Sequence, residues 1–330
     1  MENFPQRTES LPYIMDSEAL TPEYFIGHYA EFLPRYISKG RPSADTMKDY
    51  CCNIDLFIKW CVEHKRHPLA MTDYQIRIYR DYLNNKNYHP STIAIKIAAI
   101  RAFFTTAHKL NLIKANPCMD INTPSVFTHD ELFQYFSIEQ MQEICQVFDD
   151  DDNLFLRYRN TLILYLMGVE GLRNVEVHRA NVEDINWEAQ AIMVRGKGHN
   201  DPIYPCPETF EILEKYLQHC PEKIKKDGML TPLIVSDSHK NVAGRISRNG
   251  LRFIMNKALE AVNLKHPGIS CHVFRHSCGT NLYQNTKDIR VVQETLRQKD
   301  PKITARYAHV HERISHRVTS ALAIHPIDKK

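Results

Sequence analysis

The 330-residue sequence contains no long hydrophobic run, and its longest apolar stretch, near residues 162–167, is far too short to span a membrane. The first residues lack the basic and apolar segments of a secretory signal peptide, so we expect a cytoplasmic protein without a membrane partner. Glycine is scarce at 11 residues and no low-complexity segment occurs, which excludes a fibrous or disordered chain. The nine cysteines are odd in number and scattered, which predicts reduced thiols and no disulfide framework.

Charge is distributed unevenly along the chain, although the formal net charge is only +3. Residues 126–194 carry 4 basic and 13 acidic side chains, whereas residues 195–330 carry 23 basic and 13 acidic ones. Such an asymmetry is typical of a protein with a polyanion-binding face. A solvated surface of mixed charge gives the same counts, so the identity of the cations decides between the two interpretations.

Apolar residues recur at helical spacing through most of the sequence, which predicts a mainly α-helical protein with a small antiparallel sheet. The sheet is expected from a β-hairpin over residues 184–195 and a further extended piece at 203–205. Helices are expected over residues 21–33, from 45 or 46 onwards, over 73–83, from 91 onwards, from 138 onwards, and over 154–169, 175–179, 208–217, 248–262, 272–284, 289–298 and 303–314.

Breaks in this pattern predict the domain organisation. We expect an N-terminal extension over residues 1–20, a helical domain over 21–118, a linker over 119–136, an α+β domain over 137–312 and a C-terminal tail over 313–330. Apolar residues of the tail recur at near-helical spacing.

Four short clusters in this arrangement carry reactive or charged side chains. Taken singly, an arginine after a glycine is usually a surface residue and a tyrosine in a helix is usually a core residue. The clusters are Gly171-Leu172-Arg173 followed by Glu176, Gly196-Lys197-Gly198, His272-Val273-Phe274-Arg275-His276, and Tyr307.

The order Arg, Lys, His-x-x-Arg, Tyr resembles the motif set of the tyrosine recombinases, the family of phage integrases and Xer-type site-specific recombinases. The resemblance covers about residues 20–315. It implies that residues 21–118 are a SAM-like core-binding domain, that residues 137–312 are the catalytic domain, and that the two clamp duplex DNA. It also implies cleavage and rejoining of DNA through a covalent 3′-phosphotyrosyl intermediate, with integration, excision or resolution of DNA as the outcome.

The chemistry of such a site agrees with the residue types. Cutting DNA without a metal requires neutralisation of the charge on the non-bridging phosphate oxygens, for which the guanidinium groups of Arg173 and Arg275 are suited. A phenol with an ordinary pKa of ~10 is a poor nucleophile at neutral pH, so Tyr307 needs a base. The resemblance assigns that role to His272, and Lys197 on a glycine-flanked turn would protonate the departing 5′ oxygen. No cofactor is expected.

Three further residues have a place in the site by resemblance. Glu176 resembles the family's acidic support residue, although an exposed helix acid is the alternative, and His276 is expected to be a packing or hydrogen-bonding partner. Family members commonly have Leu-Gly-His before the tyrosine, where this chain has Leu296-Arg297-Gln298. Gln298 therefore takes the place of a histidine that contacts the scissile phosphate. Its amide donates a hydrogen bond but carries no charge, so we expect weaker stabilisation of the negative charge on the scissile phosphate.

Double-stranded DNA with specific recombination sites is the expected partner, together with possible accessory proteins, and the protein is expected to act on it as a tetramer. In this family a terminal helix commonly docks on a neighbouring protomer, so we expect the same of residues 313–330 unless they fold back on their own chain. Contacts with DNA, mostly with phosphates, are expected from Lys96, Arg101, Arg245, Arg248 and Arg252.

Two alternative functions stay open, and a metal site is weighed beside them. A type IB topoisomerase-like nicking-closing enzyme would use the same chemistry as a monomer. A DNA-binding regulator or accessory protein on a weakened recombinase fold would bind DNA without cutting it. A zinc site at Cys271, His272, His276 and Cys278 lacks a second half at zinc-finger spacing, so no metal is expected.

Overall fold

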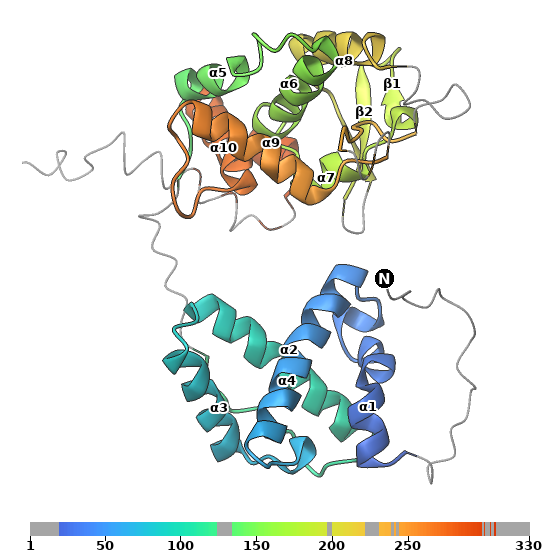
Figure 1. Cartoon of the computed structure of the whole chain (residues 1–330), viewed down its shortest axis with the longest axis vertical. Helices are drawn as coiled ribbons and strands as arrows, with labels where there is room; N and C mark the ends of the chain where they lie inside the picture. Colours follow the sequence, from blue (N-terminus) through green and yellow to red (C-terminus); the bar gives the residue numbers. More distant parts are fainter. Residues whose placement is uncertain are drawn as a thin grey trace, which may run out of the picture. The chain divides into compact units, whose positions relative to one another are not determined.

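The computed structural model describes residues 20–123, 134–196, 200–221, 231–238, 241, 244–298, 300, 304 and 307. The chain divides into two compact units, Met1–Thr128 and His129–Lys330, called here the N-terminal unit and the C-terminal unit. Figure 1 shows the elements of each unit. In the described ranges, no helix is both long enough and apolar enough to cross a membrane.

The N-terminal unit is helical. Local caps set its helix starts: Thr21 caps the first helix with a proline behind it, and Ser43, two residues before the predicted start, accepts a hydrogen bond from the amide of Thr46 at 3.2 Å. One helix, α4, contacts each of the other three (Figure 1). The helices are α1 (Pro22–Phe32), α2 (Ala44–Glu63), α3 (Asp73–Asn85) and α4 (Pro90–Lys109).

Aromatic rings fill the core of the N-terminal unit. The rings of Phe57 and Tyr79 meet edge to face at 5.1 Å, and Phe57 meets Phe104 in the same way at 5.8 Å. The apolar stripe of α4 is fully buried at Ile97 and Ile100, as its spacing predicts. This packing fixes which faces of α2 and α4 point outwards.

The C-terminal unit is built around one apolar helix, α6 (Leu154–Gly168), which contacts α5, α7, α8, α9 and α10. Its residues are buried on nearly every side, from Thr161 to Leu164 and again from Leu166 to Gly168, which explains its apolar sequence. The surrounding helices are α5 (Ile138–Gln146), α7 (Asn174–Arg179), α8 (Pro207–Gln218), α9 (Arg248–Ala261), α10 (Cys271–Thr286) and α11 (Ile289–Thr295).

The sheet has three antiparallel strands, β1 (Ile185–Asn186), β2 (Ala191–Arg195) and β3 (Asn200–Ile203), in the order β1-β2-β3. Ile192 on the central strand pairs with Ile185 on one side and with Ile203 on the other, and its side chain is buried. The next residue, Met193, is 40% exposed because successive side chains alternate between the two faces. A mainly α-helical fold with a small antiparallel sheet is thus confirmed. The third strand begins earlier than predicted, at residue 200 and not at 203.

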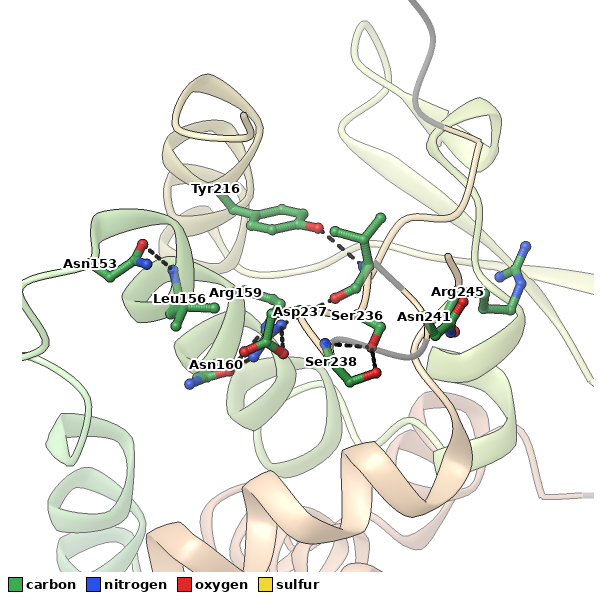
Figure 2. A network of polar contacts seen from close by, with 11 residues as sticks. Asn153, Leu156, Arg159, Asn160, Tyr216, Ser236, Asp237, Ser238, Asn241 and Arg245 are labelled. Carbon is green, nitrogen blue, oxygen red and sulfur yellow. Dashed lines mark hydrogen bonds and ion pairs between the residues drawn. The ribbon is translucent and has the colours of Figure 1, made fainter. Parts of the chain in front are cut away.

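A buried arginine attaches the segment after α8 to α6 (Figure 2). Arg159 is 3% exposed, and its Nη1 donates to the carbonyl of Val235 at 3.3 Å and to Oδ1 of Asp237 at 2.6 Å. Its Nε and Nη2 both donate to Oδ1 of Asn160, while Tyr216 on α8 accepts from the amide of Val235 at 3.3 Å. The sequence pattern did not indicate this charge inside the fold. These partners explain why Arg159 can be buried, because a buried cation needs a counter-charge and hydrogen-bond acceptors.

Candidate active site

The first part of the site is the turn between α6 and α7. Gly171 adopts a φ of +65°, and a Cβ there would lie 2.6 Å from Leu296 Cδ2 and 3.0 Å from Cys278 Sγ. Glycine is therefore required twice, for the backbone conformation and for the close approach of α10 and the end of α11. The turn places Arg173 immediately before α7.

A carboxylate organises this turn. The backbone amide of Arg173 donates to Glu176 Oε2 at 2.9 Å, and Nη1 of the same arginine donates to Oε1 at 2.7 Å. Glu176 is 2% exposed, so it is a buried support and not an exposed helix acid. Burial acts to raise the pKa of Glu176, but the amide of Arg173 and the charge of Arg297 outweigh it and hold that pKa below its ordinary value.

Arg275 approaches the same carboxylate from α10. It is 5% exposed, its Nη1 donates to the carbonyl of Gly171 at 2.5 Å, and its Nη2 donates to the carbonyl of Leu296. Nη1 lies 4.0 Å from Oε2 of Glu176. Burial, together with the neighbouring charge of Arg173, lowers the pKa of Arg275 to about 10, so the group remains cationic at neutral pH.

A third arginine, Arg297, was not identified from the sequence. Its side chain is 6% exposed, and its Nη2 donates to Oε2 of Glu176 at 3.1 Å. Its φ of +50° ends α11 at Thr295, three residues before the predicted end. The only signal in the sequence is a basic residue directly before Gln298, at a position where helical periodicity predicts a continuing helix.

Tyr307 is enclosed by the same elements. It is 0% exposed, and its ring packs so closely on α10 that a Cβ on Gly279 would lie 2.8 Å from Cζ. Its hydroxyl lies 3.3 Å from Nδ1 of His276 and accepts from Nε2 of Gln298 at 3.4 Å. Burial raises the pKa of Tyr307 above its ordinary value, although the hydrogen bond from Gln298 and the charge of Arg275 act to lower it.

Gln298 is held in turn by the residues around Tyr307. The hydroxyl of Thr304 donates to its Oε1 at 2.9 Å, and Nε2 of Gln293 donates to its backbone carbonyl at 3.0 Å. The amide therefore presents its nitrogen, the donating end, to the phenol of Tyr307. Gln298 thus connects Gln293 of α11 to the phenol of Tyr307 through two hydrogen bonds.

One residue predicted in the site cannot be placed, and another lies away from the phenol. Lys197 lies outside the described residues, as does the tail over 313–330. His272 is exposed on the first turn of α10, and the imidazole within reach of the phenol belongs to His276. The start of α10 lies near the start of α9, because Nδ2 of Asn174 reaches both the carbonyl of Arg248, at 3.2 Å, and Sγ of Cys271, at 3.7 Å.

Three of the five cations expected at DNA are occupied by contacts within the fold. Lys96, expected to contact DNA, is 6% exposed: its Nζ donates to Asn53 Oδ1 at 3.1 Å and lies 4.9 Å from the centre of the Tyr88 ring. Arg101 donates to the carbonyls of Cys118 and Ile121 at 3.0 and 2.9 Å.

Arg245 is also occupied, with Nη1 donating to the carbonyls of His178 and Ala180 at 2.7 and 2.9 Å. Arg248 and Arg252, one helical turn apart at the start of α9, are exposed. In the described part of the chain, no three His, Cys, Asp or Glu side chains come together as metal ligands.

Comparisons with known proteins agree with this arrangement. Residues 134–313 match the model of the phage integrase family, and residues 34–113 match that of the phage integrase N-terminal SAM-like domain. The tyrosine recombinase XerC of Oceanobacillus iheyensis is 27% identical over 295 residues, which cover 87% of this chain and 92% of the relative. XerC of Syntrophus aciditrophicus is 27% identical over 293 residues, which cover 84% of this chain and 91% of the relative.

Solved structures resemble the chain in fold. The post-cleavage complex of the XerH site-specific recombinase with its difH substrate superposes with a TM-score of 0.68 at 16% identity and covers 84% of this chain and 79% of that one. The Tn1549 transposon integrase in complex with circular intermediate DNA has a TM-score of 0.64 at 15% identity, and the match covers 88% of this chain and 95% of that one.

Proposed function

The chain belongs to the phage integrase family, and from that premise we propose how it cuts and rejoins DNA. It is a tyrosine-type site-specific DNA recombinase, related to XerC over most of its length. The proposal concerns the residues that carry the reaction and the assembly that performs it. The observation that supports it most strongly is the cluster of Arg173, Arg275 and Glu176 beside the phenol of Tyr307.

In the first step the phenolic oxygen of Tyr307 attacks the scissile phosphorus. A bond from this oxygen to phosphorus forms, the bond from phosphorus to the 5′ oxygen breaks, and the protein is left joined to the 3′ phosphate. The phenolic proton passes to an imidazole, that of His272 or of His276, and Lys197 protonates the departing 5′ oxygen. The 5′ hydroxyl of a second strand then attacks the phosphotyrosyl ester, so that rejoining needs no external energy source.

Arg173 and Arg275 bind the non-bridging oxygens during both steps. Their guanidinium groups donate paired hydrogen bonds in a fixed plane, and they carry charge where negative charge develops. Glu176 holds Arg173 by two hydrogen bonds, which fixes the direction of these donors before DNA arrives. Preorganisation of this kind lowers the barrier because the donors need not reorient during the reaction.

Tyr307 must leave its buried position before it can attack. Its hydroxyl is bound to His276 and Gln298, and no part of the residue is exposed. Burial also raises its pKa, so the enclosed phenol stays protonated. DNA bound against Arg173 and Arg275 would offer the phenol a new position, and the resting chain would therefore not react with adventitious phosphates.

DNA is the partner on which the protein acts, and we propose that it does so as a tetramer. An apolar groove of about 310 Å³ between α5, α6 and α10 is lined by Met141, Val169 and Leu282 among others. The tail over residues 313–330, with apolar residues at near-helical spacing, would occupy this groove on a neighbouring copy. A chain ending at residue 312 should then bind DNA but fail to assemble, as judged by light scattering of the protein–DNA complex.

The test of the reaction is recovery of the covalent intermediate. Purified protein is incubated with fragmented DNA from its source, denatured, and freed of unattached DNA, and the attached fragments are sequenced. Fragments that share a site, and that are absent with Tyr307→Phe, would support the proposal. Salt-sensitive DNA binding without any adduct would contradict it and favour a DNA-binding regulator.

A further inference from the structure

Positive charge exceeds negative charge at the centre of the site. Three guanidinium groups, those of Arg173, Arg275 and Arg297, face the single carboxylate of Glu176 among the described residues. All but Arg173 are at most 6% exposed. Buried charges are normally paired, so this cluster, with an excess of two positive charges, lacks an anion.

Arg297 has features that its contacts in the resting structure do not explain. It adopts a φ of +50°, a left-handed conformation in which a residue with a Cβ is less stable than glycine. Its Nη1 donates to the carbonyl of Thr295 at 2.9 Å, but its Nε is buried and has no hydrogen-bond partner among the described residues. A strained residue with an unused buried donor indicates that the guanidinium has a further partner when the protein works.

A pocket opens beside Arg297, on the side away from Arg173 and Arg275, which do not line it, and it leaves room for Arg297 to move towards a ligand. Its volume is about 610 Å³, and Arg297 and Gln298 line it together with Arg290, Gln293 and Glu294 of α11 and Asp201 of β3. Arg297 therefore lies between the Glu176 cluster on one side and an open pocket on the other. Gln298 contributes only a neutral amide here, so a cation that faces both the pocket and the cluster comes from Arg297.

We propose that Arg297 is a third phosphate-contacting arginine, which donates to a non-bridging oxygen of the scissile phosphate alongside Arg173 and Arg275. This inference rests on the proposed function. Arg297 supplies the positive charge that the neighbouring Gln298 lacks, and in the resting protein its contact with Glu176 keeps it in place. The excess positive charge is then neutralised when the phosphate binds.

The test compares a scissile phosphate with a scissile methylphosphonate, in which a methyl group replaces one charged oxygen. The probe is a duplex that carries a cleavage site recovered with the covalent adduct. Arg297→Gly should slow adduct formation about 100-fold or more on the phosphate, the size of effect seen when one donor to developing charge is lost. On the methylphosphonate the loss should be less than about fivefold, because the charge that Arg297 neutralises is absent.

The choice of glycine protects the test against misfolding, since glycine adopts without strain the left-handed conformation found at residue 297. Lys287→Gly is the matched control: Lys287 has a φ of +55° at the end of α10, so this variant also relieves a left-handed residue and removes one cation. It should react within about twofold of the unsubstituted chain on both substrates. Arg297→Lys keeps the charge, so its rate of adduct formation on the phosphate should lie between those of Arg297→Gly and the unsubstituted chain.

Equal losses on both substrates would overturn the inference, because a merely structural role of Arg297 affects the phosphate and the methylphosphonate alike. So would a loss of less than about fivefold on the phosphate. Failure of the unsubstituted chain to form any adduct is a different result, since it would refute the proposed function itself.

Discussion

Replacement of Glu176 by glutamine should destabilise the C-terminal unit strongly. The carboxylate is 1% exposed at its side chain and is bound by Arg173 at 2.7 Å and by Arg297 at 3.1 Å. Glutamine has the same shape, but it leaves three guanidinium groups without a counter-charge and turns an NH₂ group towards N–H donors. Removing one partner of a buried ion pair costs ~3–5 kcal/mol.

The expected loss of unfolding free energy corresponds to a clear fall in the melting temperature. A unit of this size loses ~2–4 °C for each kcal/mol, so a loss of ~3 kcal/mol corresponds to a fall in Tm of about 6–12 °C. Circular dichroism during heating measures it. Added sulfate should raise the Tm of Glu176→Gln more than that of the unsubstituted chain, because the anion offers the charge that the carboxylate supplied.

Glu170→Gln is the control for this experiment. Glu170 accepts from the amide of Cys206 at 3.0 Å and from the hydroxyl of Thr209 at 2.7 Å, with no arginine in these contacts. Its replacement should cost less and should not make the Tm more sensitive to sulfate. A fall of less than about 2 °C for Glu176→Gln, or an equal sulfate response in the two variants, would refute the assignment of Glu176 as the counter-charge.

Three further predictions follow from the contacts. The pKa of Glu176 is lowered in the folded chain, so the carboxylate stabilises the fold above the ordinary carboxyl pKa of ~4.3, and this stabilisation is lost as the pH falls below that value. Glu176→Gln should therefore flatten the decline of Tm under acid conditions. An unchanged decline would contradict this. Gly279→Ala would place a Cβ 2.8 Å from Tyr307 Cζ, so it should drive the phenol out of its buried position and speed adduct formation about fivefold, whereas an unchanged or slower rate would argue against a resting role for that position. Arg252→Gln on the exposed face of α9 should weaken DNA binding and reduce the salt slope by about 1, whereas Lys96→Met should lower Tm and leave that slope unchanged, as measured by DNA titrations at several salt concentrations.

Features of the fold that depend on residues close together in the sequence could be predicted from it. The capping box at Ser137 and Gln140 starts α5 as expected, and the cap and proline at Thr21 start α1. On α4 the apolar residues Ile93, Ile97 and Ile100 recur at helical spacing, and all three are buried. The hairpin of β1 and β2 was likewise expected over residues 184–195 and is present.

Features that depend on distant partners could not be predicted. Lys96 is buried because Asn53 and the ring of Tyr88 receive its ammonium group, and neither is near it on the helix. Arg297 belongs to the site because α11 ends early and a left-handed turn carries its guanidinium back to Glu176, 121 residues away in sequence. Local patterns identify residue types suited to phosphate chemistry, but only the fold selects which cations reach the carboxylate.

The proposed reaction joins the chain to DNA through Tyr307. The most direct measurement is tandem mass spectrometry of the covalent complex after digestion with nuclease and protease. We expect a deoxynucleotide attached through phosphate to the peptide that contains Tyr307, and no such peptide from Tyr307→Phe. A nucleotide on a different residue, or an adduct that persists in Tyr307→Phe, would contradict the account.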